Sequence, residues 1–340
     1  MSKISITDVA KCAGVSIKTV SRVINREEHV RVDTRERVEE AIATLNYRPN
    51  PSARSLAGKR AFVIGLLYDS PSGNYVVDIQ RGALRVCQRE HYELLIHPSG
   101  LQSSDLVAEV SHLLRQSKVD GFLLTPPLSD HERLLAMLRA SDARFVRIAP
   151  GDHAETARSV FTNDRESCRM MTEYLVSLGH RSLAFIVGHP DHKAVGERYR
   201  GYLDGLKAAG VPFDERLVKQ GFNTFQSGVE CGLELLRQVD RPSVVFASND
   251  DMAVGVMRAA RQSGIRIPEE LSVVGFDDIP MACQICPALT TIRQPVEAMA
   301  MKGAEMLLGQ LRGVSSGNHA VVLESVIQLR ESTGPGPCSP

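Results

Sequence analysis

The residues best suited to binding chemistry begin near the start of this sequence. Ile17, Lys18, Ser21, Arg22 and Asn25 recur at helical spacing, so a helix would present them as one stripe. The stripe carries cations, an amide, a hydroxyl and an apolar group, and such groups can read base edges in the major groove of DNA. A solvated face on an ordinary helical hairpin is the alternative interpretation of the same residues.

A second set of polar side chains follows short apolar runs later in the chain. Ligands of parallel α/β folds bind beyond the carboxyl ends of the strands. That rule selects Asp69, Ser70, Asn74, Tyr75, Thr125, Ala149, Asn223, Asn249, Asp250, Asp277 and Asp278, and Arg198 opens a helix near them. A guanidinium and a carboxylate together can hold the vicinal hydroxyls of a polyol in a buried site. Each acid could instead cap a helix, an alternative strongest for Asp250 and Asp278.

Motifs for catalysis or metal binding are missing from the sequence. It contains no GxGxxG after the first apolar run, no P-loop and no GxSxG. Cys283-x-x-Cys286 stands without a second pair, and His189 and His192 have no third ligand nearby in sequence. We therefore expect no enzyme activity, no cofactor and no metal site. Seven cysteines, an odd number, also argue against a disulfide framework.

Charge divides the chain into two unequal parts. Residues 1–60 contain 12 Lys and Arg against 7 Asp and Glu, whereas the remaining residues contain 28 against 33. A basic head on an acidic body predicts a small module that meets phosphate, joined to a larger one that does not. The polar start of the chain lacks a secretion signal, and no apolar run reaches about 18 residues. We expect a cytoplasmic protein without a membrane segment.

The elements that must position the first stripe are short helices. Ser5-Ile6-Thr7-Asp8 has the form of a capping box, and Gly14 should end the helix that follows it. Ser16 can cap a second helix that buries Val20, Val23 and Ile24. Two short helices joined at a glycine predict a helix-turn-helix.

A third helix and a break follow. Asp33-Thr34-Arg35-Glu36 offers another capping box, before an apolar stripe of Val38, Ala41, Ile42 and Leu45. Thr34 and Arg35 could touch phosphate from the start of this helix. The turn-rich segment 46–51 then precedes residues 52–58, which are too few to form a stable helix alone.

Alternating strands and helices fill the rest of the chain. Strands are predicted at 61–68, 93–97, 121–125, 145–148, 183–187, 217–221, 244–247 and 273–276, and a helix with Ile79, Leu84 and Val86 follows the first. Such alternation indicates parallel sheets covered on both faces. The series splits near 160–163, so we expect an α/β body of two doubly wound subdomains with a cleft between them.

Several motifs together resemble the lactose/galactose-repressor family of bacterial transcription regulators. In the head they are Asp8-Val9-Ala10, Ala13-Gly14-Val15-Ser16, Thr19-Val20-Ser21-Arg22-Val23, Asn25, Val38, Leu45-Asn46-Tyr47-Arg48-Pro49-Asn50 and Ser55-Leu56-Ala57-Gly58. In the body they are Leu178-Gly179-His180-Arg181, Asn249-Asp250, Val273-Val274-Gly275-Phe276-Asp277-Asp278, Leu289-Thr290-Thr291-Ile292-Arg293-Gln294 and Arg330-Glu331-Ser332-Thr333.

The resemblance implies an organisation. It gives a DNA-binding domain at 1–48, a hinge at 49–60, a body at 61–333 with crossovers near 290 and 320, and a flexible tail at 334–340. The body would be like a periplasmic sugar-binding protein. The hinge would fold on the operator, with Leu56 wedged into the minor groove beside Asn50 and Ala53.

The resemblance also implies a function: a repressor whose affinity for a near-palindromic operator depends on a small effector, most simply a sugar. A solute-binding protein without a regulatory role is the alternative. The expected DNA contacts are Ser5, Ile6, Thr7, Ser16, Ile17, Lys18, Thr19, Ser21, Arg22, Asn25, His29, Thr34, Arg35, Asn50, Ala53 and Leu56. The expected effector contacts are Asp69, Asn74, Tyr75, Thr125, Arg198, Asn223, Asn249 and Asp277.

This chain departs from the lactose-type pattern at three positions of the expected site. Ala149 replaces a carboxylate that can contact sugar, and Asn223 and Val296 replace aromatic rings. The tail after Thr333 has no leucine heptads, so we expect a homodimer through the body. The effector's identity, and whether it releases or tightens DNA binding, stay open.

Overall fold

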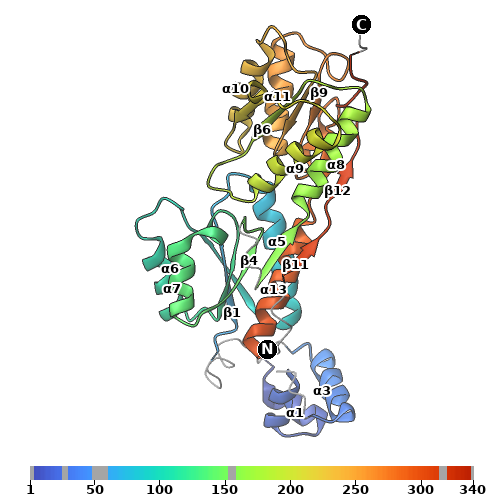
Figure 1. Ribbon diagram of the computed structural model, residues 1–340. Helices are drawn as coiled ribbons and strands as arrows, with labels where there is room; N and C mark the ends of the chain where they lie inside the picture. Colours follow the sequence, from blue (N-terminus) through green and yellow to red (C-terminus); the bar gives the residue numbers. More distant parts are fainter. Residues whose placement is uncertain (1–3, 25–29, 48–59, 152–157, 314–319, 338–340) are drawn as a thin grey trace. The chain divides into compact units, whose positions relative to one another are not determined.

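The chain forms two separate units, Met1–Phe62 and Val63–Pro340. In the computed structural model the described residues are 4–24, 30–47, 60–151, 158–313 and 320–337 (Figure 1). Among these residues, no helix combines the length and the apolar character needed to cross a membrane.

Three helices make up the described part of the first unit. They are α1 (Ile6–Ala13), α2 (Ile17–Ile24) and α3 (Val32–Thr44), and they pack around Val9, Val20 and Val38. The predicted caps of α1 and α2 and the predicted stop of α1 are present. Gly14 has a φ of 64°, and the Ser16 hydroxyl accepts a hydrogen bond from the Thr19 N–H at 3.1 Å. The predicted helix-turn-helix is therefore confirmed.

The third helix begins earlier than predicted. Arg31 occupies the N-cap position, and Asp33 lies in the first turn, so the expected cap at Asp33 is wrong. An acid in the first turn still interacts favourably with the exposed N–H groups of the helix end, which is why the sequence pattern looked like a cap.

A parallel sheet of six strands organises the first half of the body. Its order is β11-β5-β4-β3-β1-β2. The strands are β1 (Val63–Tyr68), β2 (Glu93–Pro98), β3 (Gly121–Leu124), β4 (Arg144–Ile148), β5 (Ser159–Thr162) and β11 (Val321–Leu323). One face packs on α6 (Leu106–Arg115) and α7 (Glu132–Ala140), and the other on α5 (Gly73–Glu90) and α13 (Val296–Arg312) (Figure 1).

A second parallel sheet organises the other half, in the order β7-β6-β8-β9. Its strands are β6 (Leu183–Val187), β7 (Val218–Gln220), β8 (Val244–Ala247) and β9 (Ser272–Val274). One face packs on α8 (Asp164–Ser177) and α9 (Val195–Ala208), and the other on α10 (Phe225–Leu236) and α11 (Asp250–Gln262). A short helix, α12 (Met281–Gln284), follows β9. The expected pair of doubly wound subdomains is confirmed.

Three crossovers join the two sheets. The chain leaves β5 for α8, passes through β10 (Thr291–Arg293) toward α13, and returns from β11 through β12 (Val326–Gln328). Strands β10 and β12 pair in antiparallel fashion. The Asn163 carboxamide oxygen accepts a hydrogen bond from the Ser325 N–H at 2.7 Å, which ties the first crossover to the third.

Two details differ from the sequence predictions. Leu84 is 43% exposed, because α5 buries a stripe that includes Val76, Ile79, Ala83 and Val86, and Leu84 lies beside that stripe. The described part of the expected flexible tail, residues 334–337, is hydrogen-bonded: the Gly336 N–H donates to the Leu178 carbonyl at 2.7 Å. A side chain at position 336 would collide with the backbone of Gly179, so glycine permits this contact.

Candidate ligand cavity and nucleic-acid interface

A cavity lies between the two sheets of the body, and we call it the Arg198 cavity. Its walls come from the loop and helix after β1, from residues after β3 and β4, and from residues after β6 to β9 of the second sheet. All these segments follow the carboxyl ends of parallel strands, where α/β folds place their ligands. The volume of about 60 Å³ holds only a few waters.

Arg198, in the first turns of α9, is the central charge of this cavity. It is 9% exposed, and its Nε donates to Asp164 Oδ2 at 2.9 Å while its Nη1 donates to the Ser248 carbonyl at 2.6 Å. The guanidinium also lies 3.8 Å from the centre of the Phe276 ring. Burial disfavours its charge, but Asp164 and Asp277 outweigh that effect and raise the pKa of Arg198. Arg198 is thus held as a fixed cation.

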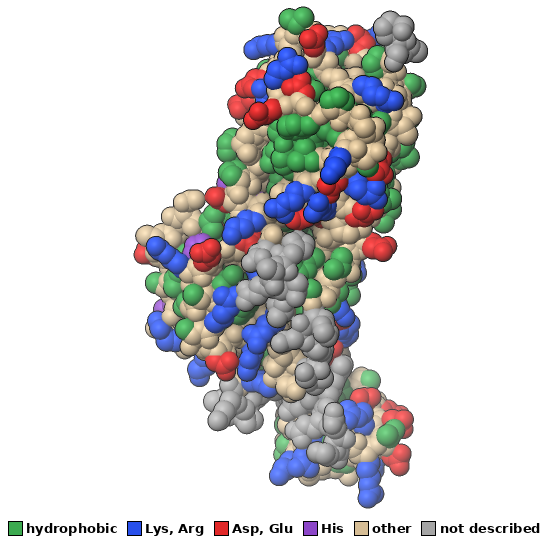
Figure 2. Space-filling model, viewed as in Figure 1, with side chains coloured by type: hydrophobic (Ala, Val, Ile, Leu, Met, Phe, Trp, Pro, Cys, Tyr) green, Lys and Arg blue, Asp and Glu red, His purple; other side chains and the backbone are tan. Residues whose placement is uncertain are grey.

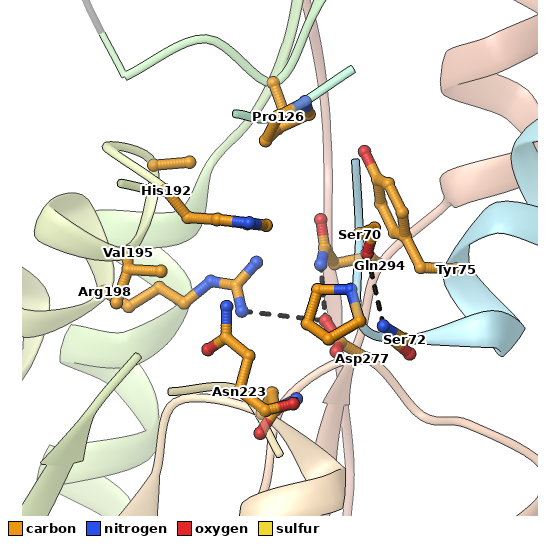
Figure 3. A pocket seen from close by; sticks show the side chains of 14 residues that line it. Ser70, Ser72, Tyr75, Pro126, His192, Val195, Arg198, Asn223, Asp277 and Gln294 are labelled. Carbon is orange, nitrogen blue, oxygen red and sulfur yellow. Dashed lines mark hydrogen bonds and ion pairs between the residues drawn. The ribbon is translucent and has the colours of Figure 1, made fainter. Parts of the chain in front are cut away.

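Asp277 faces Arg198 across the cavity (Figure 3). Its Oδ1 lies 3.6 Å from Arg198 Nη1 and accepts a hydrogen bond from Gln294 Nε2 at 2.6 Å. Its backbone has a φ of 114°, a strained conformation for a residue with a side chain, and its N–H donates to the Ile292 carbonyl. Burial raises the pKa of Asp277 to about 6, although the nearby Arg198 opposes the shift. The carboxylate is ionised at neutral pH but titrates close to it.

Several polar atoms around the cavity have no partner. The Tyr75 hydroxyl, the Asn223 carboxamide oxygen and the hydroxyl of Ser248 are buried without a hydrogen bond. Leaving such atoms unpaired costs free energy, and native proteins seldom do so without a functional reason. Burial, followed by electrostatic interaction with His189 and Arg198, lowers the pKa of His192 to about 4, so this cavity residue presents a neutral imidazole. Together, these polar atoms and the His192 imidazole fit a ligand rich in hydroxyl groups.

The structure brings together some of the expected effector contacts and not others. Those that line the Arg198 cavity are Tyr75, Arg198, Asn223, Asn249 and Asp277. The remaining three, Asp69, Asn74 and Thr125, do not line it. Asp69 accepts the Leu101 N–H at 2.7 Å, the Thr125 hydroxyl donates to the Leu67 carbonyl, and Asn74 is exposed. The strand-end rule found the correct edge of the sheet, but hydrogen bonds to segments distant in sequence occupy Asp69 and Thr125 there.

Two acids that could have been helix caps have other roles. The cap of α11 is Asn249, whose side chain accepts the Met252 N–H at 3.0 Å. Asp250 is fully buried and accepts the Ile279 N–H at 2.8 Å and the Thr291 hydroxyl at 2.6 Å, so it joins α11 to two other segments.

Asp278 does not cap a helix either. It accepts hydrogen bonds from Arg293 and Arg330 at 2.6 Å each. The capping alternative is therefore wrong for both Asp250 and Asp278, and neither carboxylate lines the Arg198 cavity.

Several residues of the site escaped the sequence analysis, and three of them carry polar side chains that bear on its chemistry. Asp164 follows β5, and that strand was interpreted only as a boundary, so the strand-end rule did not reach it. Gln294 appeared only as the last letter of a family motif. His192 was weighed as a metal ligand with His189, whose ring centre lies 5.5 Å away. Among the described residues, no group of three or more His, Cys, Asp or Glu side chains could hold a metal ion.

In the first unit, α2 presents the stripe expected to read DNA. Ile17 is 48% exposed, Lys18 and Arg22 are exposed, and Thr19 and Ser21 are half-buried. Of the other expected DNA contacts, Ser5, Thr7 and Ser16 are exposed and Ile6, Thr34 and Arg35 are half-buried. Five expected contacts lie outside the described residues: Asn25, His29, Asn50, Ala53 and Leu56.

The comparisons with known proteins cover nearly the whole chain. Residues 5–50 match the model of bacterial regulatory proteins of the lacI family, and residues 172–333 match a periplasmic binding protein-like domain. The chain is 34% identical to the HTH-type transcriptional repressor PurR of Pectobacterium carotovorum, over 98% of each protein. It is 31% identical to the ribose operon repressor of Haemophilus influenzae, over 96% of this chain and 98% of that one.

Solved structures agree with these relatives. A complex of the transcriptional regulator CelR with cellobiose has a TM-score of 0.75 and 31% identity, over 97% of this chain and 100% of the other. The lac repressor dimer bound to operator and the anti-inducer ONPF has a TM-score of 0.76 and 28% identity, over 98% and 100%. The resemblance found in the sequence is confirmed: this chain belongs to the LacI family of bacterial regulatory proteins.

Proposed function

We propose that the protein is a cytoplasmic transcriptional repressor, without enzyme activity, that binds operator DNA through α2 and senses a small polyhydroxy effector in the Arg198 cavity. One observation carries the sensing part: the Arg198–Asp277 pair shares one cavity with buried polar atoms that have no hydrogen-bond partner. The exposed stripe on α2 supports the DNA-binding part. Family membership joins the two activities in one chain.

The charge distribution supports α2 as the DNA-contacting surface. On the face of the body visible in Figure 2, positive and negative side chains are interspersed, without one broad field of positive charge. Many of the arginines are paired, as in Arg165 with Asp204 at 2.5 Å and Arg169 with Glu166 at 2.6 Å. The surplus of positive charge lies in residues 1–60. Phosphate contacts should therefore come from the head.

A sugar is the effector class that best fits the Arg198 cavity. A guanidinium donates to sugar oxygens, a carboxylate accepts from sugar hydroxyls, and unpaired hydroxyl and amide groups complete the set. One solved structure is a complex of the regulator CelR with cellobiose, and another relative is named as the repressor of a ribose operon. We propose that a homodimer binds a near-palindromic operator and that effector binding, by moving the two subdomains, releases it.

A screen of the full-length protein tests this function directly. Melting temperature is measured with a series of sugars, sugar phosphates and nucleosides, since a ligand bound to the native state raises it. Operator affinity is then measured with and without the stabilising compound. Stabilisation by a sugar that also changes operator affinity supports the proposal. A protein that binds operator but is stabilised only by nucleosides would contradict the choice of a sugar.

Lys18 and Arg35 should affect DNA binding in different ways. Lys18→Ala removes a group from the exposed stripe of α2, so it should cost about 1–3 kcal/mol and relax preference at one base pair per half-site. Arg35→Ala removes a phosphate contact near the start of α3 and should weaken all sequences about equally. A selection from randomised half-sites measures both effects. Unchanged base preference in Lys18→Ala would contradict the role of α2.

Effector affinity should depend on the protonation of Asp277. Because its pKa is raised to about 6, the carboxylate is ionised above pH 7 and gains a proton as the pH falls through 6. Protonation removes the negative charge and turns one acceptor oxygen into a hydroxyl donor, so the neutral form accepts more weakly from sugar hydroxyls. We expect constant affinity between pH 7 and 8, then a fall approaching tenfold per pH unit well below pH 6. Calorimetry across this range checks it, with Asp277→Asn as the control that should lose the dependence.

A further inference from the structure

Gly151 brings the backbone of one subdomain into contact with the backbone of the other. It follows β4 in the six-stranded half, and it lies against Lys193 and Ala194, which precede α9 in the other half. A Cβ atom at position 151 would lie 2.5 Å from the Lys193 carbonyl carbon and 2.8 Å from the Ala194 nitrogen. Non-bonded carbon atoms in contact are ordinarily about 3.5–4.0 Å apart. A side chain at position 151 is therefore incompatible with this contact.

The backbone conformation of Gly151 does not itself require glycine. Its φ lies outside the left-handed region, which is the conformation that favours glycine over other residues. Among the glycines in the described part of the chain, Gly151 is the only one at which the nearest neighbours of an added Cβ belong to the other subdomain. The closeness of the two subdomains, and not the local path of the chain, is what excludes a side chain.

Hydrogen bonds fix both sides of this contact. The Gly151 N–H donates to Asp130 Oδ2 at 2.9 Å, and the other carboxylate oxygen of Asp130 accepts from Arg147 Nη2 at 2.7 Å in a buried ion pair. On the opposite side, the Lys193 carbonyl accepts the Gly196 N–H at 3.0 Å. Because each side is held within its own subdomain, an added side chain would move the subdomains apart more readily than it would deform either segment.

The contact lies beside the Arg198 cavity. Ala194, which directly follows Lys193, lines this cavity. The same segment makes a further contact with the six-stranded half, where Gln102 Nε2 lies 3.5 Å from Asp191 Oδ2. The segment before α9 thus forms part of the cavity wall and also marks how closely the two subdomains approach each other.

We infer that Gly151 is a positioning residue for the coupling between the two binding sites: it allows the subdomains to close at the Arg198 cavity, and a side chain there holds them apart. This inference rests on the proposed function and adds a residue to it. An effector in the cavity contacts both subdomains and favours closure, and closure releases the operator. Coupling between two sites is reciprocal, so operator binding disfavours closure.

Cross-linking of the full-length protein measures closure without an effector. Gln102→Cys and Asp191→Cys place one thiol on each subdomain, and a short bismaleimide joins the two thiols only while the subdomains are close. Mass spectrometry quantifies the joined peptides. Adding Gly151→Ala should lower the cross-linking rate about tenfold or more, since the rate follows the closed population. The melting temperature should stay within a few degrees, because the change removes no contact from either hydrophobic core.

Gly196→Ala is the matched control. Gly196 lies in the first turn of α9, and an added Cβ there meets nothing within 4 Å. This change should leave the cross-linking rate unaltered. In the same control protein, a duplex carrying the near-palindromic operator that the wild-type protein selects should lower the rate.

Equal cross-linking rates for Gly151→Ala and Gly196→Ala would overturn the role of Gly151. A control rate that operator DNA leaves unchanged would overturn it as well, because closure would then be uncoupled from DNA binding. So would a large fall in the melting temperature of Gly151→Ala, since the glycine would then serve the fold of one subdomain. Failure of the full-length protein to bind any operator would instead overturn the proposed function.

Discussion

Removal of Met1–Phe62 should lower operator affinity by at least a thousandfold and leave effector affinity within about twofold. The two units have separate hydrophobic cores, because the cluster around Val9, Val20 and Val38 contains no residue of the body. The remaining unit of two sheets is long enough to fold alone. It lacks the exposed stripe of α2, the surface proposed to enter the major groove. Fluorescence anisotropy with labelled operator measures the loss.

Salt dependence provides the control for this experiment. If the head of the full-length protein neutralises phosphates, the logarithm of its affinity should fall linearly with the logarithm of salt concentration, with a slope of about −0.9 per contact. The truncated protein should show only weak binding at low salt. Retention of full operator affinity by the truncated protein would mean that the body, and not α2, binds DNA.

Arg198→Ala should abolish effector binding and also destabilise the body. The change leaves Asp164, which is buried, and Asp277, which is largely buried, without the cation that pairs with both. Breaking a buried ion pair by removing one partner costs about 3–5 kcal/mol. Effector affinity should fall at least a hundredfold, and urea unfolding of the same variant measures the stability loss.

Asp277→Asn separates binding from stability. The carboxamide oxygen can still accept the Gln294 hydrogen bond, and Arg198 keeps Asp164 as its partner. Burial of the Asp277 charge raises its pKa, so removing that charge should not lower the free energy of unfolding at neutral pH. Effector affinity should still fall at least tenfold, with operator affinity unchanged in the absence of effector. Wild-type effector affinity in both variants would place the ligand elsewhere.

Local patterns were enough to predict the elements of this protein. Ser16 caps α2 and Gly14 ends α1 because cap geometry depends on a few adjacent residues. The alternation of apolar runs and helical stripes predicted parallel strands in both halves of the body. Strand β5 was missed because its four residues coincide with the crossover between the sheets. Asp164 follows this strand and was therefore not recognised as a site residue.

The location of the candidate site was predicted, since strand ends could be found in the sequence. Which residues line the site was not predicted. Asp69 and Asp277 look alike in sequence, because each follows a predicted apolar strand. The fold gives Asp69 the N–H of Leu101, 32 residues away, and leaves Asp277 facing Arg198. Which acid stays available depends on which distant segment reaches it, and no local pattern contains that information.

The sequence by itself therefore determined the helix-turn-helix, the two α/β subdomains and the family, because these follow from periodicity, caps and motifs read along the chain. Only the tertiary structure decided that Asp250 and Asp278 hold the body together while Asp277 faces the cavity. It also decided that the tail is hydrogen-bonded to the body at Gly336. The physical reason is that hydrogen-bond partners and cavity walls come from segments far apart in sequence, which only folding brings together.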